Sequence, residues 1–160
     1  MRSFGFLSLP LALVSCATPP PQQPPAIDQR SYNLGGIGAF AEVVGAGVKK
    51  LALSAPMSPA EMDGLIEEAE RIVQRNHALS YRETDFLTTD LFPAEVTDGK
   101  HVLLIFTGSV KDEYMALKAE KKALVDQNRY DGEARKEIAR KMGRLLSYSD
   151  EKIEALLAGK

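Results

Sequence analysis

The sequence predicts a small single α/β domain with a short parallel sheet and a helix-rich C-terminal third, preceded by a signal peptide and a proline-rich tether. Three observations lead to this prediction. The run from His101 to Phe106 is apolar without alternation, which is typical of a strand buried on both faces. Ser58-Pro59-Ala60-Glu61 has the residues of a helix start. Beyond residue 108, capping residues are repeatedly followed by apolar residues at helical spacing.

Residues 1–15 have the layout of a secretory signal peptide. Arg2 supplies the positive start, Phe4 to Val14 the apolar core, and Ser15 the small residue before the cut. The apolar core has about 11 residues, whereas a helix needs roughly 20 to cross a bilayer. We therefore expect a cleaved signal and no permanent transmembrane span.

The residues Leu13-Val14-Ser15-Cys16 resemble the lipobox of bacterial lipoproteins. The resemblance implies that the Cys16 thiol carries a diacylglyceryl group, that the chain is cut just before it, and that the new amino terminus is acylated, for example with palmitate. Because Ala17 rather than aspartate follows, the resemblance favours the outer membrane, facing the periplasm. An ordinary, unmodified thiol is the alternative.

Residues 16–31 form the lipidated cysteine and its linker, and residues 32–160 the domain. The proline-dense stretch 17–25 predicts an extended polyproline II spacer of about 3.1 Å per residue. A ligand for a proline-recognising module is the alternative interpretation. The remaining length suffices for one domain with a proper core.

The first elements of the domain follow from local patterns. A helix is expected from about Ile37 to Ala46, closed by Gly47, and then a strand from Val48 to Ser54. The helix that begins after Ser58 has one apolar face and should last to about Ala78.

The second half should contain the central strand and three helices. We expect His101 to Phe106 to lie parallel beside the strand from Val48 to Ser54, joined by a long right-handed crossover. Helices should then begin after Ser109, after Asp131 and after Ser149.

The charge is distributed unevenly along the chain. The net charge of -2 gives no general attraction to nucleic acid, and no nucleic-acid partner is expected. Residues 51–99 hold three basic and ten acidic residues, whereas residues 100–160 hold thirteen basic and ten acidic ones. The two halves should therefore attract each other.

Acidic residues and histidines gather around the middle of the chain and form the first candidate site. Carboxylates with an imidazole bind divalent metals or share acid and base roles. Their spacing fits no specific ligand set, so no metal or cofactor is assigned; the alternative is an edge strand guarded by charge. The candidates are Glu83, Asp85, Asp90, His77 and His101.

Two further candidate sites are an anion site and a basic surface. The helix starts at Ser58 and Ser109 should point their free amides toward one edge of a parallel sheet, unless the serines only cap the helices. A basic stripe on the helix after Asp131 should meet lipid headgroups, cell-wall polymer or an acidic envelope protein, or else pair with the acidic helix at Glu61 to Glu70. The stripe consists of Arg135, Lys136, Arg140, Lys141 and Arg144.

These observations favour binding over chemistry. The sequence has no Gly-x-Ser-x-Gly elbow and no cysteine beyond Cys16, so a catalytic nucleophile is not indicated. The hypothesis is a lipid-anchored envelope protein whose domain binds or scaffolds a partner. The alternative is a small periplasmic enzyme or metal-dependent binder that uses Glu83, Asp85, Asp90 and a histidine.

Overall fold

The computed structural model describes residues 26–92 and 94–159. The predicted signal peptide, Cys16 and residues 17–25 lie outside the described residues. Within them, the elements follow in the order α1 (Gln29–Gly45), β1 (Leu51–Leu53), α2 (Pro59–Arg75), β2 (Leu79–Glu83), the short 3-10 helix η1 (Ala94–Val96), β3 (Val102–Phe106), α3 (Val110–Asp126), α4 (Gly132–Leu145) and α5 (Asp150–Ala158).

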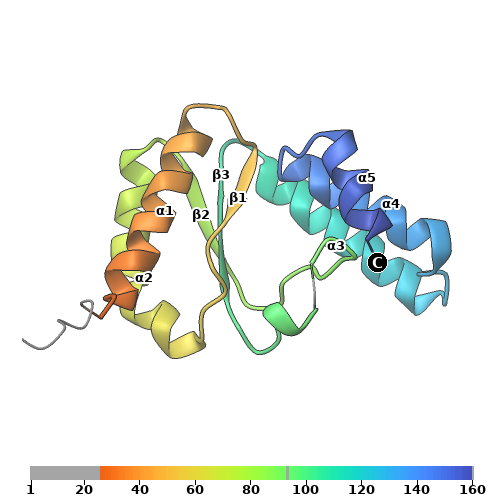
Figure 1. Ribbon diagram of the computed structural model, residues 1–160, viewed down its shortest axis with the longest axis horizontal. Helices are drawn as coiled ribbons and strands as arrows, with labels where there is room; N and C mark the ends of the chain where they lie inside the picture. The colour runs from red at the N-terminus through yellow and green to blue at the C-terminus, as the bar shows by residue number, and fades with distance from the viewer. Residues whose placement is uncertain (1–25, 93, 160) are drawn as a thin grey trace, which may run out of the picture.

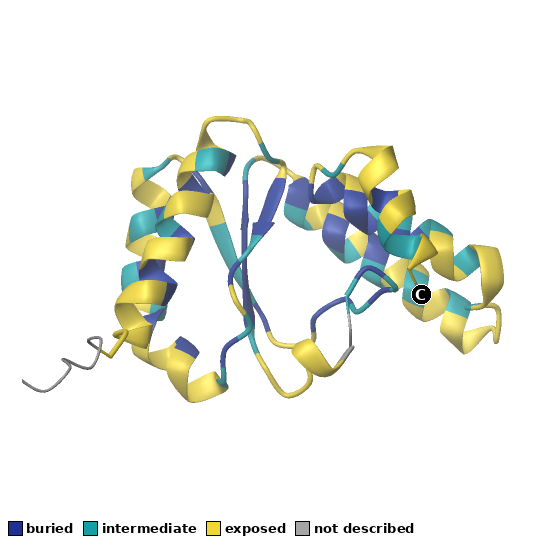
Figure 2. Cartoon of the chain, in the orientation of Figure 1, coloured by how far each residue is buried: buried dark blue, intermediate teal, exposed yellow. Residues whose placement is uncertain are grey.

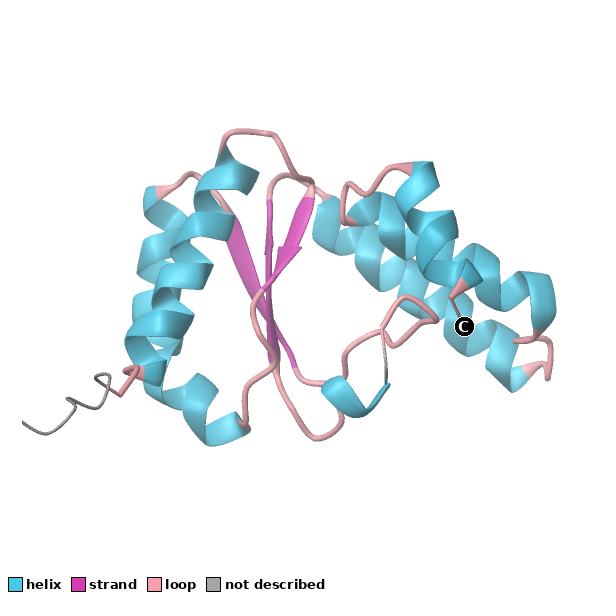
Figure 3. Cartoon of the chain, viewed as in Figure 1, coloured by secondary structure: helices cyan, strands magenta, loops and turns pink. Residues whose placement is uncertain are grey.

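The described elements form three layers, with a sheet of strand order β1-β3-β2 in the middle (Figures 1 and 3). Helices α1 and α2 cover one face, and α3, α4 and α5 cover the other. The side chains of β3 divide between these layers, since Leu103 and Ile105 pack with α1 and α2 while Leu104 and Phe106 pack with the C-terminal helices. All five residues of β3 are buried, so the predicted central strand is confirmed (Figure 2).

The prediction of a parallel sheet is wrong. Both β1 and β2 pair antiparallel with β3. A crossover through α2 joins β1 to β2, and these two strands run in the same direction. The chain then reverses direction and enters β3, which lies between β1 and β2. Because β2 intervenes, β3 necessarily runs opposite to β1.

The helix starts follow their capping residues. Helix α1 begins earlier than predicted because Asp28 accepts a hydrogen bond from the Arg30 amide (3.2 Å) and caps it. Ser58 forms a reciprocal capping box with Glu61, and Ser149 accepts from the Lys152 amide (3.2 Å). The local caps therefore fix the starts of the helices that flank the sheet.

A glycine allows α1 to approach the end of α2. A Cβ atom on Gly45 would lie 1.9 Å from the carbonyl oxygen of Asn76, the residue that follows α2. Gly64, within α2, would meet nothing within 4 Å. Only the first of these glycines is required by packing.

We predict opposite effects of alanine at these two positions. Gly45→Ala should lower the free energy of unfolding by about 1–3 kcal/mol, because the helix ends must separate. Gly64→Ala should raise it by up to about 1 kcal/mol through helix propensity. Urea denaturation of the two variants beside the wild type measures both, and a stabilised Gly45→Ala variant would contradict the close approach of α1 and α2.

Candidate functional site

Glu83 and Asp85 share one lysine on the α3 side of the sheet. The Glu83 side chain is only 3% exposed, and both of its carboxylate oxygens lie 3.2 Å from the Lys118 ammonium nitrogen. It also accepts a hydrogen bond from the Asp85 amide (2.9 Å). The exposed Asp85 carboxylate lies 3.1 Å from the same ammonium. Both carboxylates are thus paired with a cation.

The other members of the acidic cluster lie elsewhere. Asp90 pairs with Arg135 of α4. His101 lies on the opposite face of the sheet, where its Nδ1 accepts a hydrogen bond from the Arg82 guanidinium (3.0 Å). His77 is exposed in the turn before β2, at the far end of that strand. No imidazole joins the carboxylates, and within residues 26–92 and 94–159 no group of three or more such side chains is placed to hold a metal.

The acidic cluster instead holds the long connection between β2 and β3, residues 84–101, which we call the β2–β3 loop. The buried hydroxyl of Tyr114 accepts the Leu87 amide (2.9 Å), and Lys121 donates to the carbonyl of Thr88 (2.7 Å). Burial raises the pKa of Tyr114, so its hydroxyl stays protonated. Together with Lys118, these residues lie on one face of α3 and clamp the start of the loop.

Strand β1 lies at one edge of the described sheet, and its first two residues are buried. The Ser54 amide donates to the carbonyl of Leu103 (3.0 Å), which places Ser54 in the hydrogen-bonded set of the antiparallel ladder. Because that set alternates along a strand, the backbone groups of Leu51 and Leu53 point away from β3. Among the described residues, no hydrogen bond to these outward groups is found. Leu51 is nevertheless 0% exposed, so surrounding atoms cover its outward groups, and only Leu53 is partly exposed.

A β-bulge follows β1. Met57 and His101 exchange backbone hydrogen bonds of 3.0 and 2.8 Å, so the stretch from Ser54 to Met57 has one more residue than the facing stretch from His101 to Leu103. The Ser54 hydroxyl accepts the Leu103 amide (2.9 Å). Pro56 lies within the bulge and has no amide hydrogen to offer. Regular pairing of β1 with β3 therefore ends at Ser54.

An apolar cavity of about 240 Å³ lies along this edge. Its walls come from α1, from the β2–β3 loop and from the connection between α4 and α5. A second depression of about 430 Å³ shares Phe40 and Ser54 with it and continues along α1 past Tyr32 and Gly36. We call the two together the edge groove. The residues that line the cavity besides β1 include Phe40, Phe86, Phe92, Val96, Leu146 and Tyr148.

One end of the edge groove is positively charged. Among the described residues that line it, only Lys49 is charged. Its ammonium donates to the Leu146 carbonyl (2.7 Å) and lies 5.2 Å from the centroid of the Tyr148 ring. Within the described part of the chain, neither Lys49 nor the adjacent, exposed Lys50 forms an ion pair. Lys50 does not line the edge groove; it lines a separate depression together with Glu113 and Glu120 of α3.

The two serine-capped helix starts do not share an edge of the sheet, contrary to the prediction. Because β1 and β3 are antiparallel, the helices that follow them begin at opposite ends and on opposite faces. At Ser58, the amide and hydroxyl both donate to the Glu61 carboxylate, at 2.8 and 2.7 Å. Ser109 occupies the cap position of α3 without a side-chain hydrogen bond. A shared anion site is thus not formed.

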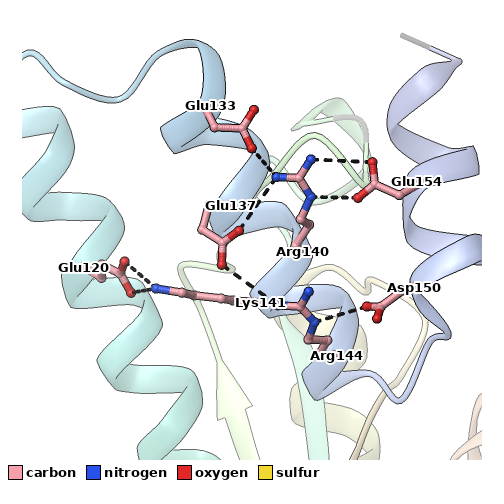
Figure 4. A network of polar contacts seen from close by, with 8 residues as sticks. All are labelled: Glu120, Glu133, Glu137, Arg140, Lys141, Arg144, Asp150 and Glu154. Carbon is pink, nitrogen blue, oxygen red and sulfur yellow. Dashed lines mark hydrogen bonds and ion pairs between the residues drawn. The ribbon is translucent and has the colours of Figure 1, made fainter.

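The basic stripe is largely neutralised by carboxylates (Figure 4). Arg140 lies between Glu133 and Glu154, with 2.7 Å to Glu154, and these hydrogen bonds raise its pKa. Lys141 pairs with Glu120 of α3 (2.7 Å). Arg144 pairs with Glu137 and Asp150, and Arg135 with Asp90, whereas Lys136 is exposed near Glu154. The partners lie on α3, α4, α5 and the β2–β3 loop, and not on the acidic helix α2.

Comparisons with known proteins give no further indication of function. No family model matches the chain, and no similar curated protein or solved structure is found. The edge groove was not predicted from the sequence. Two features of the sequence could have indicated it. One is the aromatic residue Phe40 in a stretch without charged residues, and the other is the long polar segment that precedes His101.

We predict that the Lys118 contact is a structural one. Lys118→Met should lower the free energy of unfolding by about 3–5 kcal/mol, because it leaves the Glu83 carboxylate buried without a cation. Adding Glu83→Gln should restore most of that loss, since no charge then remains buried. Urea denaturation of the single and double variants measures the coupling, and equal stability of the two variants would show that the pair does not hold the β2–β3 loop.

Proposed function

We propose that this protein is a lipid-anchored cell-envelope protein whose α/β domain binds a partner through the edge groove. The single observation that supports binding is the apolar cavity of about 240 Å³ beside β1, whose walls include the exposed side chains of Phe40 and Val96. Cys16 is the proposed point of attachment, at the outer membrane and facing the periplasm. In this proposal the membrane is reached through the lipid, and the partner is another component of the envelope.

The proposal of an anchor rests on the lipobox and on the order of the segments. In the part of the chain that the structure describes, no helix has both the length and the apolar character needed to cross a bilayer. Residues 17–25 separate Cys16 from the described domain, and at about 3.1 Å per residue a polyproline II spacer of this length places the domain some tens of ångströms from the lipid. Two or three acyl chains suffice for stable anchoring.

The contacts of the candidate catalytic residues support binding over catalysis. Glu83, Asp85 and Asp90 are each paired with a lysine or an arginine. In the edge groove, the Ser54 hydroxyl donates to the Ala55 carbonyl (2.9 Å) and accepts the Leu103 amide, with no imidazole partner. These groups satisfy one another, as structural polar groups do.

We predict that the mature protein begins with a lipid-modified Cys16. Intact-mass measurement of the protein from membranes should give the chain from residue 16 with added acyl groups, and the wild type should enter the detergent phase of a Triton X-114 separation. Cys16→Ser should keep the signal peptide and lose the lipid mass. An unmodified thiol, or a mature chain that starts elsewhere, would contradict the anchor.

A second variant tests the destination. In bacterial lipoproteins, aspartate after the cysteine retains the protein at the inner membrane, so Ala17→Asp should move the protein from outer-membrane to inner-membrane fractions of a sucrose gradient. Ala17→Ser is the matched control and should leave the distribution unchanged. Wild-type protein already in the inner-membrane fraction would contradict the proposed location.

A further inference from the structure

We propose that the edge groove binds a free fatty acid, whose linear acyl chain fills the apolar cavity and whose carboxylate meets the ammonium of Lys49. The inference rests on the proposed binding function and names the class of ligand for that site. Three features of the groove lead to it: its elongated apolar shape, the hydrogen bonds already made by its polar groups, and the contacts of Lys49.

The shape of the groove favours a linear apolar chain. The cavity of about 240 Å³ continues past Phe40 into the depression of about 430 Å³ along α1. Phe86 and Phe92 meet edge to face, with ring centroids 6.4 Å apart, and form one wall of the cavity. An apolar cavity of about 150 Å³ already holds a benzene ring, so this one accepts a longer molecule.

Two exposed side chains add to the apolar surface of the groove. Phe40 and Val96 have 40% and 44% of their surfaces exposed, although both line the cavity. An acyl chain seated against them removes its own surface and theirs from water. The gain grows with each methylene that enters the cavity.

The polar groups along β1 offer little to a ligand that needs hydrogen bonds. Leu51 and Ala52 are 0% and 1% exposed, so their backbone groups are covered. The Ser54 hydroxyl already makes two hydrogen bonds with backbone groups, one as donor and one as acceptor. A peptide or a sugar would leave its own polar groups unpaired here, which is costly, whereas an acyl chain has none to pair.

Lys49 favours a carboxylate as the headgroup. Among the described residues that line the groove it is the only charged one, and it is half-buried. Its ammonium has three N–H donors and uses one on the Leu146 carbonyl, at 2.7 Å. The Tyr148 ring, whose centroid is 5.2 Å from the same nitrogen, holds the lysine beside the cavity. Donors therefore remain for a carboxylate, and such charge-assisted hydrogen bonds are the strong ones.

Other sources of an acyl chain are poorer occupants. A phospholipid, like the lipid proposed on Cys16, has acyl chains whose carboxyl groups are esters or amides, so neither brings a free carboxylate to Lys49. A second copy of the protein that covers Phe40 and Val96 is the remaining competitor. Sedimentation of the protein at the concentrations used for binding distinguishes that case.

The experiment is a calorimetric titration of decanoate into the full chain carrying Cys16→Ser. We expect saturable binding of one molecule per chain. Decylammonium has the same tail and the opposite charge, and it should bind about tenfold or more weakly because it cannot accept a hydrogen bond from Lys49. From hexanoate to octanoate, each methylene should strengthen binding by about fourfold. Absence of saturable binding, equal affinity for the two headgroups, or no effect of chain length would overturn the proposal.

Two lysine variants test the headgroup contact. Lys49→Met should abolish the preference for decanoate over decylammonium. Lys121→Met is the matched control and should keep it, because Lys121 also donates to a carbonyl, that of Thr88 at 2.7 Å, and lies 5.1 Å from the centroid of Tyr130, but does not line the groove. The preference is a ratio measured on one protein, so a general loss of stability does not imitate it. Equal effects of the two variants would contradict the contact.

Two valine variants test the location. Val96→Glu should weaken decanoate binding by about tenfold or more, because it places a charge against the acyl chain. Val125→Glu changes a valine of similar exposure (49%) on α3 outside the groove and should have no effect. Equal effects in proteins with matched melting temperatures would place binding elsewhere. A stable dimer that excludes decanoate would assign the groove to a second copy of the chain and overturn the proposal.

Photocrosslinking in cells separates this inference from the proposed function. In the lipidated protein, Phe40→p-benzoylphenylalanine should crosslink to an acyl chain, detected as added mass on the peptide that contains position 40. A crosslink to an envelope polypeptide instead would overturn the inference and leave the proposed binding function standing. Conversely, decanoate binding by a protein whose Cys16 proves to carry no lipid would contradict the anchor alone.

Discussion

Burial of β3 on both faces is the constraint on which the rest of the structure depends. Five consecutive apolar residues leave no face of this strand that water can cover, so each face requires its own layer of helices. The N-terminal helices supply one layer and the three C-terminal helices the other, as Figure 2 shows in the buried centre of the molecule. With β3 in the centre and the described sheet limited to three strands, both of its neighbours are edges.

A buried ion pair at the end of β2 positions one wall of the cavity beside β1. Strand β2 places Arg82 and Glu83 at its end, and the buried Glu83 binds Lys118 to hold the β2–β3 loop against α3. That loop then forms one wall of the cavity beside β1. Glu83 and Asp85, which the sequence suggested as candidate catalytic or metal-binding residues, thus stabilise the loop that forms part of the cavity wall. Exposed ion pairs such as those of Arg144 add little stability individually, whereas loss of the buried pair is costly.

The sequence predicted what depends on local residues. The continuous apolar run identified β3, and capping patterns identified the starts of α2 and α5. The uneven charge was also informative, since Lys118 and Arg135 join the basic half of the chain to acids of the other half. Strand direction was not predictable in this way, because it depends on β2, a short and largely polar strand that adds one reversal. The edge groove was not predictable either, because its walls come from segments as distant as Phe40 and Tyr148.

Amide hydrogen exchange along the sheet tests the burial of β3 most directly. The Leu104 and Ile105 amides should exchange slowly, because each faces a neighbouring strand and both residues are buried between the two helix layers. The Ser80 amide of β2 should exchange much faster, because it faces away from β3. Fast exchange at Leu104 and Ile105 would contradict the account, since it would mean that the two helix layers do not cover the central strand.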